Sequence, residues 1–345
     1  MFMHVLMSAG IYDIGGFSTV IEQLANNITK KGHDVTIGAL WFKNFPPSGS
    51  YKVNTIPIGN IFKLRKFLSS FDIIHNHHAI TNYLPLVCHK PFIYHHHGAP
   101  NIGRDYLFRL NMVLSIKLMK NTFDSVIAVS ESGFINLKKY FDIDKIHLIY
   151  NGVDTSIFMP GLEEKFRKGN PQFLFVGNLY EHKKVEELIF AMNLLVEKYP
   201  KSYLQIVGHG KMYWTLKNLI TKLKLQNHVE LVGRVSAKEL PYYYASCDAY
   251  VTASRWELFG LPLLETMACG KPFIASSIPP HLELLNKSQA GAVYPIGDLV
   301  ALCNYMIKIY EEHENYKDNA IHFAIQNDWS IVADQILENY YHLCE

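Results

Sequence analysis

Cysteine is scarce in this sequence, and the few cysteines form no recognisable framework. The 345 residues include five of them, and no two have the C-x-x-C spacing of a zinc or redox motif. They lie at Cys88, Cys247, Cys269, Cys303 and Cys344. An odd number of scattered cysteines argues against the disulfide network on which small secreted domains depend. We therefore expect a protein of a reducing compartment, the cytoplasm.

Long apolar runs and processing signals are also missing. No stretch approaches the ~18 consecutive apolar residues of a membrane helix. Residues 1–7 have neither a basic region nor a cleavage site of small residues, and we expect them to begin the first strand of a mature protein. Low-complexity segments are absent as well. The length predicts two folded domains.

The charge of the chain is nearly balanced but unevenly divided. Residues 1–160 hold 15 Lys and Arg against 10 Asp and Glu, a net charge of +5, whereas residues 161–345 hold 18 against 21, a net charge of −3. A basic first half suits an anionic membrane, but ordinary solvated faces explain the difference equally well. The segment 104–121 mixes basic and apolar residues; packing on a sheet is the favoured interpretation, and peripheral docking at the inner membrane face is the alternative. We expect no nucleic-acid partner.

Short β-rich runs alternate with helical periods, which predicts an α/β fold with a parallel sheet covered by helices on both faces. Strands are expected at residues 4–8, 34–40, 53–58, 72–76, 91–95, 125–129 and 145–150. Helices are expected at 17–31, 61–69, 79–88, 104–121 and 131–140. Such doubly wound domains bind ligands at the carboxyl ends of their strands. Gly15 and Gly16 lie in a loop after the first strand, where a phosphate site is expected, although G-x-G-x-x-G is absent.

Two histidine clusters end predicted strands, His75-Asn76-His77-His78 and His95-His96-His97-Gly98. The two-residue period of a strand puts His75 with His77, and His95 with His97, on one face. Histidine is a common metal ligand, so a metal-dependent hydrolase is one alternative function. The sequence lacks H-x-x-E-H or similar spacing, which would also supply a general base. We therefore expect no metal site.

The second half starts the strand–helix pattern again, with strands expected at 172–176, 203–207, 248–252 and 272–275. Lys183 follows the first of these strands and offers a cation suited to the charge on a leaving diphosphate. The most informative stretch follows the third strand and holds two carboxylates eight positions apart, Glu257 and Glu265. Between them, Gly260 allows close backbone approach to a ligand, and Pro262 suits the first turn of a helix, in which Glu265 is also expected to lie. Helix amides favour a phosphate and carboxylates accept hydrogen bonds from hydroxyls, a combination that suits a sugar nucleotide.

This stretch, E-x7-E with FG-x-P inside it and CGKP after it, resembles the signature motif of the retaining glycosyltransferases of family 4, which have the GT-B fold. The resemblance implies that Glu265 binds the nucleotide ribose, and that Glu257 with the backbone of Leu258, Phe259, Gly260 and Leu261 holds the sugar. It also implies that Lys183 and Asn178 lie in the family's G-[RN]-x-x-x-x-K loop, with Lys183 on the diphosphate. Backbone near Val235 would meet the nucleotide base.

The first half carries weaker marks of the same family. Its Gly-Gly pair, here Gly15-Gly16, approaches the donor diphosphate. The stretch 72–77 resembles the strand end D-h-h-H-x-H, and His97-Gly98 resembles an H-G whose histidine borders the transferred sugar. Residues 151–158 resemble N-G-V-D-x-x-x-F, which closes the first domain. The candidate catalytic residues are therefore Glu257, His97 and Lys183.

Four positions depart from the family pattern. Asn178 stands where many members have Arg, so one of two phosphate cations is missing. Lys184 stands where a glycine is usual. Pro279 and Pro280 replace a Gly-Gly pair before Glu283, and two prolines remove two amide donors. Phosphate binding is thus expected to depend on Lys183 and the helix amides beside Gly260.

The resemblance implies two Rossmann-like domains facing a cleft. The expected divisions are an N-terminal acceptor-side domain at 1–160, a linker at 161–171, a nucleotide-sugar domain at 172–327, and a final helix at 328–345 that packs back on the first domain. The expected reaction transfers a sugar from a UDP- or GDP-linked donor to a glycan, lipid-linked or small-molecule acceptor. No cofactor or metal is expected, since amides and Lys183 hold the diphosphate. A nucleotide-sugar epimerase and a non-catalytic glycan-binding protein are further alternatives.

Overall fold

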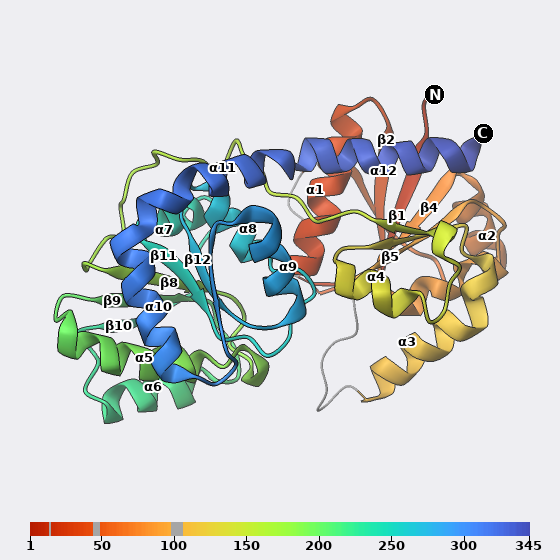
Figure 1. Cartoon of the computed structure of the whole chain (residues 1–345). Coiled ribbons are helices and arrows are strands. Elements are labelled where there is room, and N and C mark those ends of the chain that lie inside the picture. The colour runs from red at the N-terminus through yellow and green to blue at the C-terminus, as the bar shows by residue number, and fades with distance from the viewer. Residues whose placement is uncertain (14, 44–48, 98–105) are drawn as a thin grey trace. The chain divides into compact units, whose positions relative to one another are not determined.

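The computed structural model describes residues 1–13, 15–43, 49–97 and 106–345 and divides the chain into two compact units (Figure 1). The first unit is Met1–Gly152 with Trp329–Glu345, and the second is Val153–Asp328. The boundary between the units thus falls before residue 160, the expected end of the first domain, and the expected linker at 161–171 lies within the second unit. The start and the end of the second unit are joined by hydrogen bonds: the backbone N–H and the hydroxyl of Thr155 donate to the Asp328 carboxylate at 3.1 and 2.6 Å. Gly98 and Arg104 lie outside the described residues.

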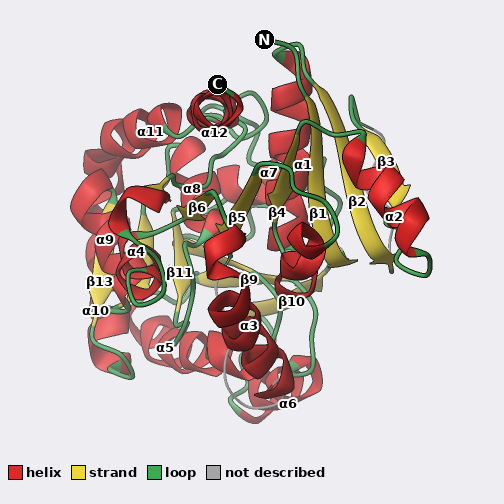
Figure 2. Ribbon diagram, turned by 90° about the vertical axis from the view of Figure 1, so that its right-hand side faces the viewer, coloured by secondary structure: helices red, strands yellow, loops and turns green. Residues whose placement is uncertain are grey.

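The first unit is built on a seven-stranded parallel sheet in the order β3-β2-β1-β4-β5-β6-β7 (Figure 2). Its strands are β1 (His4–Tyr12), β2 (Asp34–Phe42), β3 (Lys52–Thr55), β4 (Ile73–Asn76), β5 (Phe92–His96), β6 (Ser125–Ala128) and β7 (Ile146–Leu148). Strands β4 and β5 are buried along their whole length, as expected for a sheet covered on both faces. The first strand extends beyond its expected end at residue 8, because it pairs with β2 as far as Tyr12.

The helices of the first unit are α1 (Gly16–Lys30), α2 (Ile61–Ser69), α3 (Tyr106–Met119), α4 (Glu131–Leu137) and α12 (Trp329–Cys344). The C-terminal α12 packs against α1 (Figure 1), and Lys31 pairs with Asp334 at 2.8 Å. The helix expected at 79–88 is instead the 3₁₀ helix η1 (Ala79–Leu86), with Pro85 inside it. Proline lacks the N–H that an α-helix interior requires, which explains the difference.

The second unit has a six-stranded parallel sheet in the order β10-β9-β8-β11-β12-β13. Its strands are β8 (Gln172–Val176), β9 (Tyr203–Val207), β10 (Val229–Gly233), β11 (Ala249–Thr252), β12 (Phe273–Ser276) and β13 (Gly291–Tyr294). Its helices are α5 (Val185–Lys198), α6 (Tyr213–Lys222), α7 (Leu240–Ala245), α8 (Leu261–Ala268), α9 (Pro279–Ser288), α10 (Leu299–Glu312) and α11 (Lys317–Gln326). Two doubly wound sheets confirm the predicted α/β class with two Rossmann-like domains.

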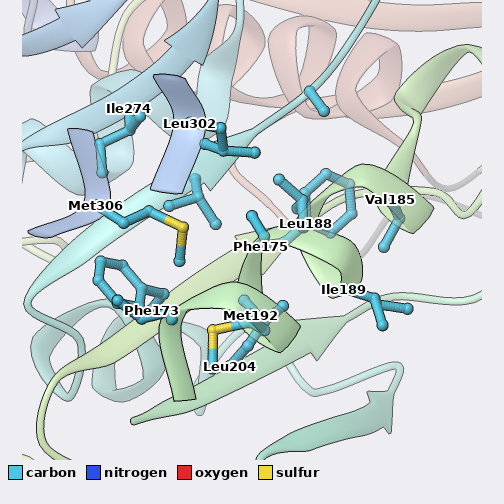
Figure 3. Close-up of a cluster of buried hydrophobic side chains, with 14 of the residues drawn as sticks. Phe173, Phe175, Val185, Leu188, Ile189, Met192, Leu204, Ile274, Leu302 and Met306 are labelled. Atoms are coloured by element: carbon cyan, nitrogen blue, oxygen red, sulfur yellow. The ribbon is translucent and has the colours of Figure 1, made fainter. Parts of the chain in front are cut away.

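The core of the second unit fixes the strand that leads to Lys183. Phe173 and Phe175 of β8 are fully buried and belong to one cluster with Leu188 and Met192 of α5 and Met306 of α10 (Figure 3). Each buried side chain of this size contributes about 1.5–3 kcal/mol. The loop between β8 and α5 is therefore held at both ends by packed elements.

Two further expectations concern cysteines and membranes. All five cysteines are free. Among the described helices, none combines the length and the apolar character that a membrane crossing requires.

Candidate functional site

The winding of the second sheet reverses between β8 and β11, which are neighbours although β9 and β10 separate them in sequence. Ligands of doubly wound sheets bind at such a switch point, outside the carboxyl ends of the strands. Lys183 follows β8 and Glu257 follows β11, and the Lys183 ammonium donates a hydrogen bond to Oε1 of Glu257. Their side chains are 17% and 19% exposed, so this ion pair is partly open to solvent. The structure thus brings together two of the predicted site residues.

Glu257 is held as a carboxylate. Burial pushes its pKa upward, but the Lys183 ammonium, with a smaller contribution from His281 and the Ser254 hydroxyl, brings the pKa below its usual value. The Ser254 hydroxyl donates to Oε1 at 2.8 Å. The carboxylate is therefore ionised at neutral pH and oriented from two sides.

Glu265 has a different environment. It is the fifth residue of α8 and lies in the second turn of that helix, not in the first turn as expected, because α8 begins at Leu261. Burial raises the pKa of Glu265 to about 7, although the hydrogen bond from the Tyr244 hydroxyl opposes this shift. That bond reaches Oε2 at 2.5 Å. Oε1 is thus the oxygen of Glu265 that the Tyr244 bond leaves to a ligand.

The start of α8 has the backbone that the sequence predicts. Gly260 has φ +104°, a left-handed conformation that favours glycine, and Pro262 is in the first turn. Leu263 N–H donates to the Gly260 carbonyl at 2.9 Å. In the described part of the chain, the amides of Gly260 and Leu261 donate to no protein acceptor, as expected of a helix N-terminus that can bind an anion. Beside them, Leu258 is half-buried and Phe259 is buried.

The loop after β8 contains the substitution at Lys184. Lys184 adopts the left-handed conformation, with φ +50°, in which the family usually has a glycine. The backbone of Gly208 packs closely against the same loop, because an added Cβ at Gly208 would lie 1.9 Å from the Gly177 carbonyl oxygen. Asn178 is exposed in this loop, and Val235 is half-buried beyond β10. Neither side chain meets Glu257 or Lys183 through a hydrogen bond within the described residues.

Pro279 and Pro280 are the first two residues of α9, not part of a loop. The start of α9 therefore lacks two amide donors.

Sequence reasoning missed several residues that support the motif. Arg255 pairs with Glu187 of α5, and its N–H donates to the His182 carbonyl at 2.7 Å. His281 is buried near Glu257, and its Nδ1 lies 2.9 Å from the Ser276 carbonyl oxygen. Arg255 lies two residues before Glu257, so the sequence could have indicated that it is near the site. His281 comes near the site only because α9 packs there, which no local pattern indicates.

In the first unit, Gly15 and Gly16 follow β1, which borders β4 at the switch point of the sheet, and His97 follows β5, the next strand along. Gly15 precedes α1, and an added Cβ there would meet no atom within 4 Å. Phe17 of α1 lies edge-on to the His97 ring, with centroids 5.2 Å apart. The His97 Nε2 lies 2.8 Å from Nδ1 of His77. The start of α1 and the end of β5 therefore adjoin.

Comparison with known proteins agrees with this geometry. The family model described as Glycosyltransferase Family 4 matches residues 14–157, and that described as Glycosyl transferases group 1 matches residues 163–323. A glycosyltransferase of Methanocaldococcus jannaschii is 29% identical over 321 residues, covering 82% of each chain.

Two further relatives add a named reaction and a fold. An Escherichia coli UDP-Gal:alpha-D-GlcNAc-diphosphoundecaprenol alpha-1,3-galactosyltransferase is 26% identical over 310 residues, covering 81% of this chain and 78% of its own. The structure of Anabaena HepE in complex with UDP and glucose superposes with a TM-score of 0.82 at 20% identity, covering 98% and 99% of the two chains, which supports the GT-B fold. The comparisons give no support to a hydrolase. The chain belongs to the family 4 glycosyltransferases, also described as glycosyl transferases group 1, and is a hexosyltransferase that uses a nucleotide sugar.

Proposed function

We propose that this enzyme transfers a hexose or N-acetylhexosamine from a UDP- or GDP-linked donor with retention of the anomeric configuration. The observation that carries the proposal is the Lys183–Glu257 ion pair beside the open amides of Gly260 and Leu261. It combines a cation and helix amides for the diphosphate with a carboxylate for sugar hydroxyls. Lys183 and these amides stabilise the leaving diphosphate, and no metal ion is required there.

The remaining donor contacts are proposed from the resemblance to the family. Oε1 of Glu265 accepts from the ribose hydroxyls, and Glu257 with the backbone of Leu258 and Phe259 positions the sugar. Gly15, Gly16 and Asn178 approach the diphosphate, and the backbone at Val235 meets the base. His97 borders the reacting carbon. The leaving phosphate takes the acceptor proton, and no residue is assigned as a covalent nucleophile.

The acceptor is proposed to be a glycan or lipid-linked glycan, with a small molecule as the alternative. The name of the Escherichia coli relative specifies a diphosphoundecaprenol acceptor. In this chain, α3 exposes Leu110, Leu114 and Leu118, which are 42%, 44% and 70% exposed, on one side, with Lys117 and Lys120 also exposed. Such a face suits peripheral docking on an anionic membrane at the cytoplasmic side. Sedimentation with vesicles should show binding to anionic but not neutral lipid, and a Leu114→Ser/Leu118→Ser variant that sediments equally would contradict this docking.

A donor and acceptor screen tests the reaction. Thermal shift identifies the nucleotide that stabilises the protein, and the matching donor is then incubated with acceptors without added divalent metal. NMR should show nucleoside diphosphate release only with an acceptor, and an α-linked product from an α-linked donor. An inverted linkage would contradict retention, and a strict requirement for added Mg²⁺ or Mn²⁺ would contradict the metal-free diphosphate site. Conversion of the donor without an acceptor would favour an epimerase.

A further inference from the structure

Four histidine rings gather on one face of the first sheet, at the carboxyl ends of β4 and β5. His75 and His77 lie with ring centroids 4.3 Å apart, and so do His95 and His97. This arrangement confirms the faces that strand alternation predicts. His75, His77 and His95 are at most 3% exposed. His96 points to the other face, where its Nδ1 lies 3.0 Å from the Tyr94 hydroxyl.

The hydrogen bonds within the cluster leave two buried ring nitrogens unpartnered. The Tyr340 hydroxyl lies 2.6 Å from Nδ1 of His75, and Nε2 of His75 lies 3.1 Å from Nδ1 of His95. This series of hydrogen bonds ends at Nε2 of His95. Neither Nε2 of His95 nor Nε2 of His77 has a partner in the described structure. A neutral imidazole has one donor and one acceptor, so no choice of tautomers supplies these nitrogens with partners. Unpartnered buried polar atoms are costly and call for a ligand or an ordered water.

We propose that His75, His77 and His95 bind one metal ion of the zinc class, Zn²⁺ or Co²⁺, within the first unit. One ring nitrogen from each of the three lies within 4.8 Å of the other two. Ligands at about 2.0–2.1 Å from a tetrahedral ion are about 3.4 Å apart, so modest closure of the rings completes the site. Imidazole nitrogen suits zinc and neighbouring metals.

The hydrogen bonds that the rings make with their neighbours suit metal binding. Metal-bound histidines characteristically have their second ring nitrogen hydrogen-bonded. Here Nδ1 of His75 meets the Tyr340 hydroxyl and Nδ1 of His77 meets His97. Nε2 of His77 has no partner among the described residues, and Nε2 of His75 would exchange its 3.1 Å contact with Nδ1 of His95 for a bond to the ion.

The proposed site does not depend on the proposed transfer reaction. Stabilisation of the leaving diphosphate is assigned to Lys183 and helix amides of the second unit, whereas this ion would join β4 to β5 and fix the His77 ring, which contacts His97. With three neutral ligands, the fourth position is expected to hold water or hydroxide, as in open zinc sites.

Metal content tests the proposal directly. Untagged protein is stripped with a chelator, reloaded with Zn²⁺ or Co²⁺, dialysed, and measured by elemental analysis and visible absorption. We expect one ion per chain and the visible bands of tetrahedral Co²⁺. His95→Phe should reduce the bound metal at least tenfold, whereas His96→Phe, on the opposite face of β5, should retain it. Circular dichroism and a cooperative melting transition establish that each variant is folded.

Two outcomes would overturn the proposal. One is folded wild-type protein that takes up neither ion at micromolar concentration, with an ordered water between the rings in a crystal structure. The other is equal metal content in the wild type and His95→Phe. For the case that His95→Phe does not fold, His77→Gln with the same His96→Phe control decides in its place.

Discussion

Lys183 and Glu257 form an ion pair across the switch point of the second sheet, although 74 positions separate them in sequence. Both side chains are less than one-fifth exposed, and the Ser254 hydroxyl also binds the carboxylate. In the proposed function, the donor diphosphate meets the Lys183 ammonium and the donor sugar meets Glu257. The ion pair and the Ser254 hydrogen bond therefore hold both side chains in position before the donor binds.

Loss of the Lys183 cation should be unusually damaging in this enzyme. Asn178 stands in place of the family's second cation, and the prolines at 279 and 280 remove amide donors, so the proposed diphosphate site depends on Lys183 and the amides beside Gly260. We expect Lys183→Ala to reduce turnover about 10²–10³-fold, the range for removal of one group that stabilises developing negative charge. Nucleoside diphosphate release measures this. Lys184→Ala is the matched control, and unchanged kinetics in Lys183→Ala would show that another group holds the diphosphate.

Glu257→Gln keeps the shape of the side chain but removes its charge. A hydrogen bond to a charged group contributes about 1.5–3 kcal/mol, so we expect turnover to fall about 10–100-fold. Glu186→Gln on α5, whose carboxylate pairs with Lys184 at 3.2 Å, should leave turnover unchanged. Equal activity of the two variants would contradict the assignment of Glu257 to the sugar.

Glu265→Gln should weaken donor affinity more than turnover, because the ribose is remote from the bond that breaks. We expect about a tenfold rise in the dissociation constant of the nucleoside diphosphate, measured by calorimetry. An unchanged dissociation constant would remove Glu265 from the ribose contacts.

Stability should respond to pH through Glu265. Its pKa is raised to about 7 in the folded protein, so between about pH 4.5 and 7 the folded state holds a proton that the unfolded state releases. The free energy of unfolding therefore falls as pH rises through this window, by on the order of 1–3 kcal/mol. Glu265→Gln lacks this penalty. Its melting temperature relative to wild type should increase from about pH 5 to about pH 8, and a constant difference would contradict the raised pKa.

Close backbone approach at Gly208 predicts a stability difference between two glycine variants. Both Gly208 and Gly233 have positive φ, but an added Cβ at Gly208 would lie 1.9 Å from the Gly177 carbonyl oxygen, whereas at Gly233 it would meet nothing within 4 Å. Gly208→Ala should be less stable than Gly233→Ala by at least about 1–3 kcal/mol in denaturant unfolding, as for overpacking. Equal stabilities would show that the loop after β8 yields freely.

Local patterns predicted much of the fold. The expected helix at 61–69 and the expected strands at 172–176 and 203–207 coincide with the observed elements, because turn residues bound them and their apolar periods are regular. Gly260 and Pro262 likewise predicted the start of α8, since these residues have specific backbone preferences. The extension of β1 to Tyr12 was missed because it depends on pairing with β2. The 3₁₀ helix η1 was missed because the proline at 85 overrides the local helical period. The place of Glu265 in the second turn of α8 was missed because that helix begins at Leu261.

The sequence by itself determined the alternation of strands and helices in both halves, the loop from Glu257 to Gly260, and the shared faces of the paired histidines, because each depends on residues close along the chain. Only the tertiary structure decided that Lys183 pairs with Glu257, that the Tyr244 hydroxyl bonds to Glu265, and that the Tyr340 hydroxyl bonds to His75. These contacts depend on which strands become neighbours and on where distant helices pack. Such choices are made by burial over the whole domain, and no short stretch of sequence contains them.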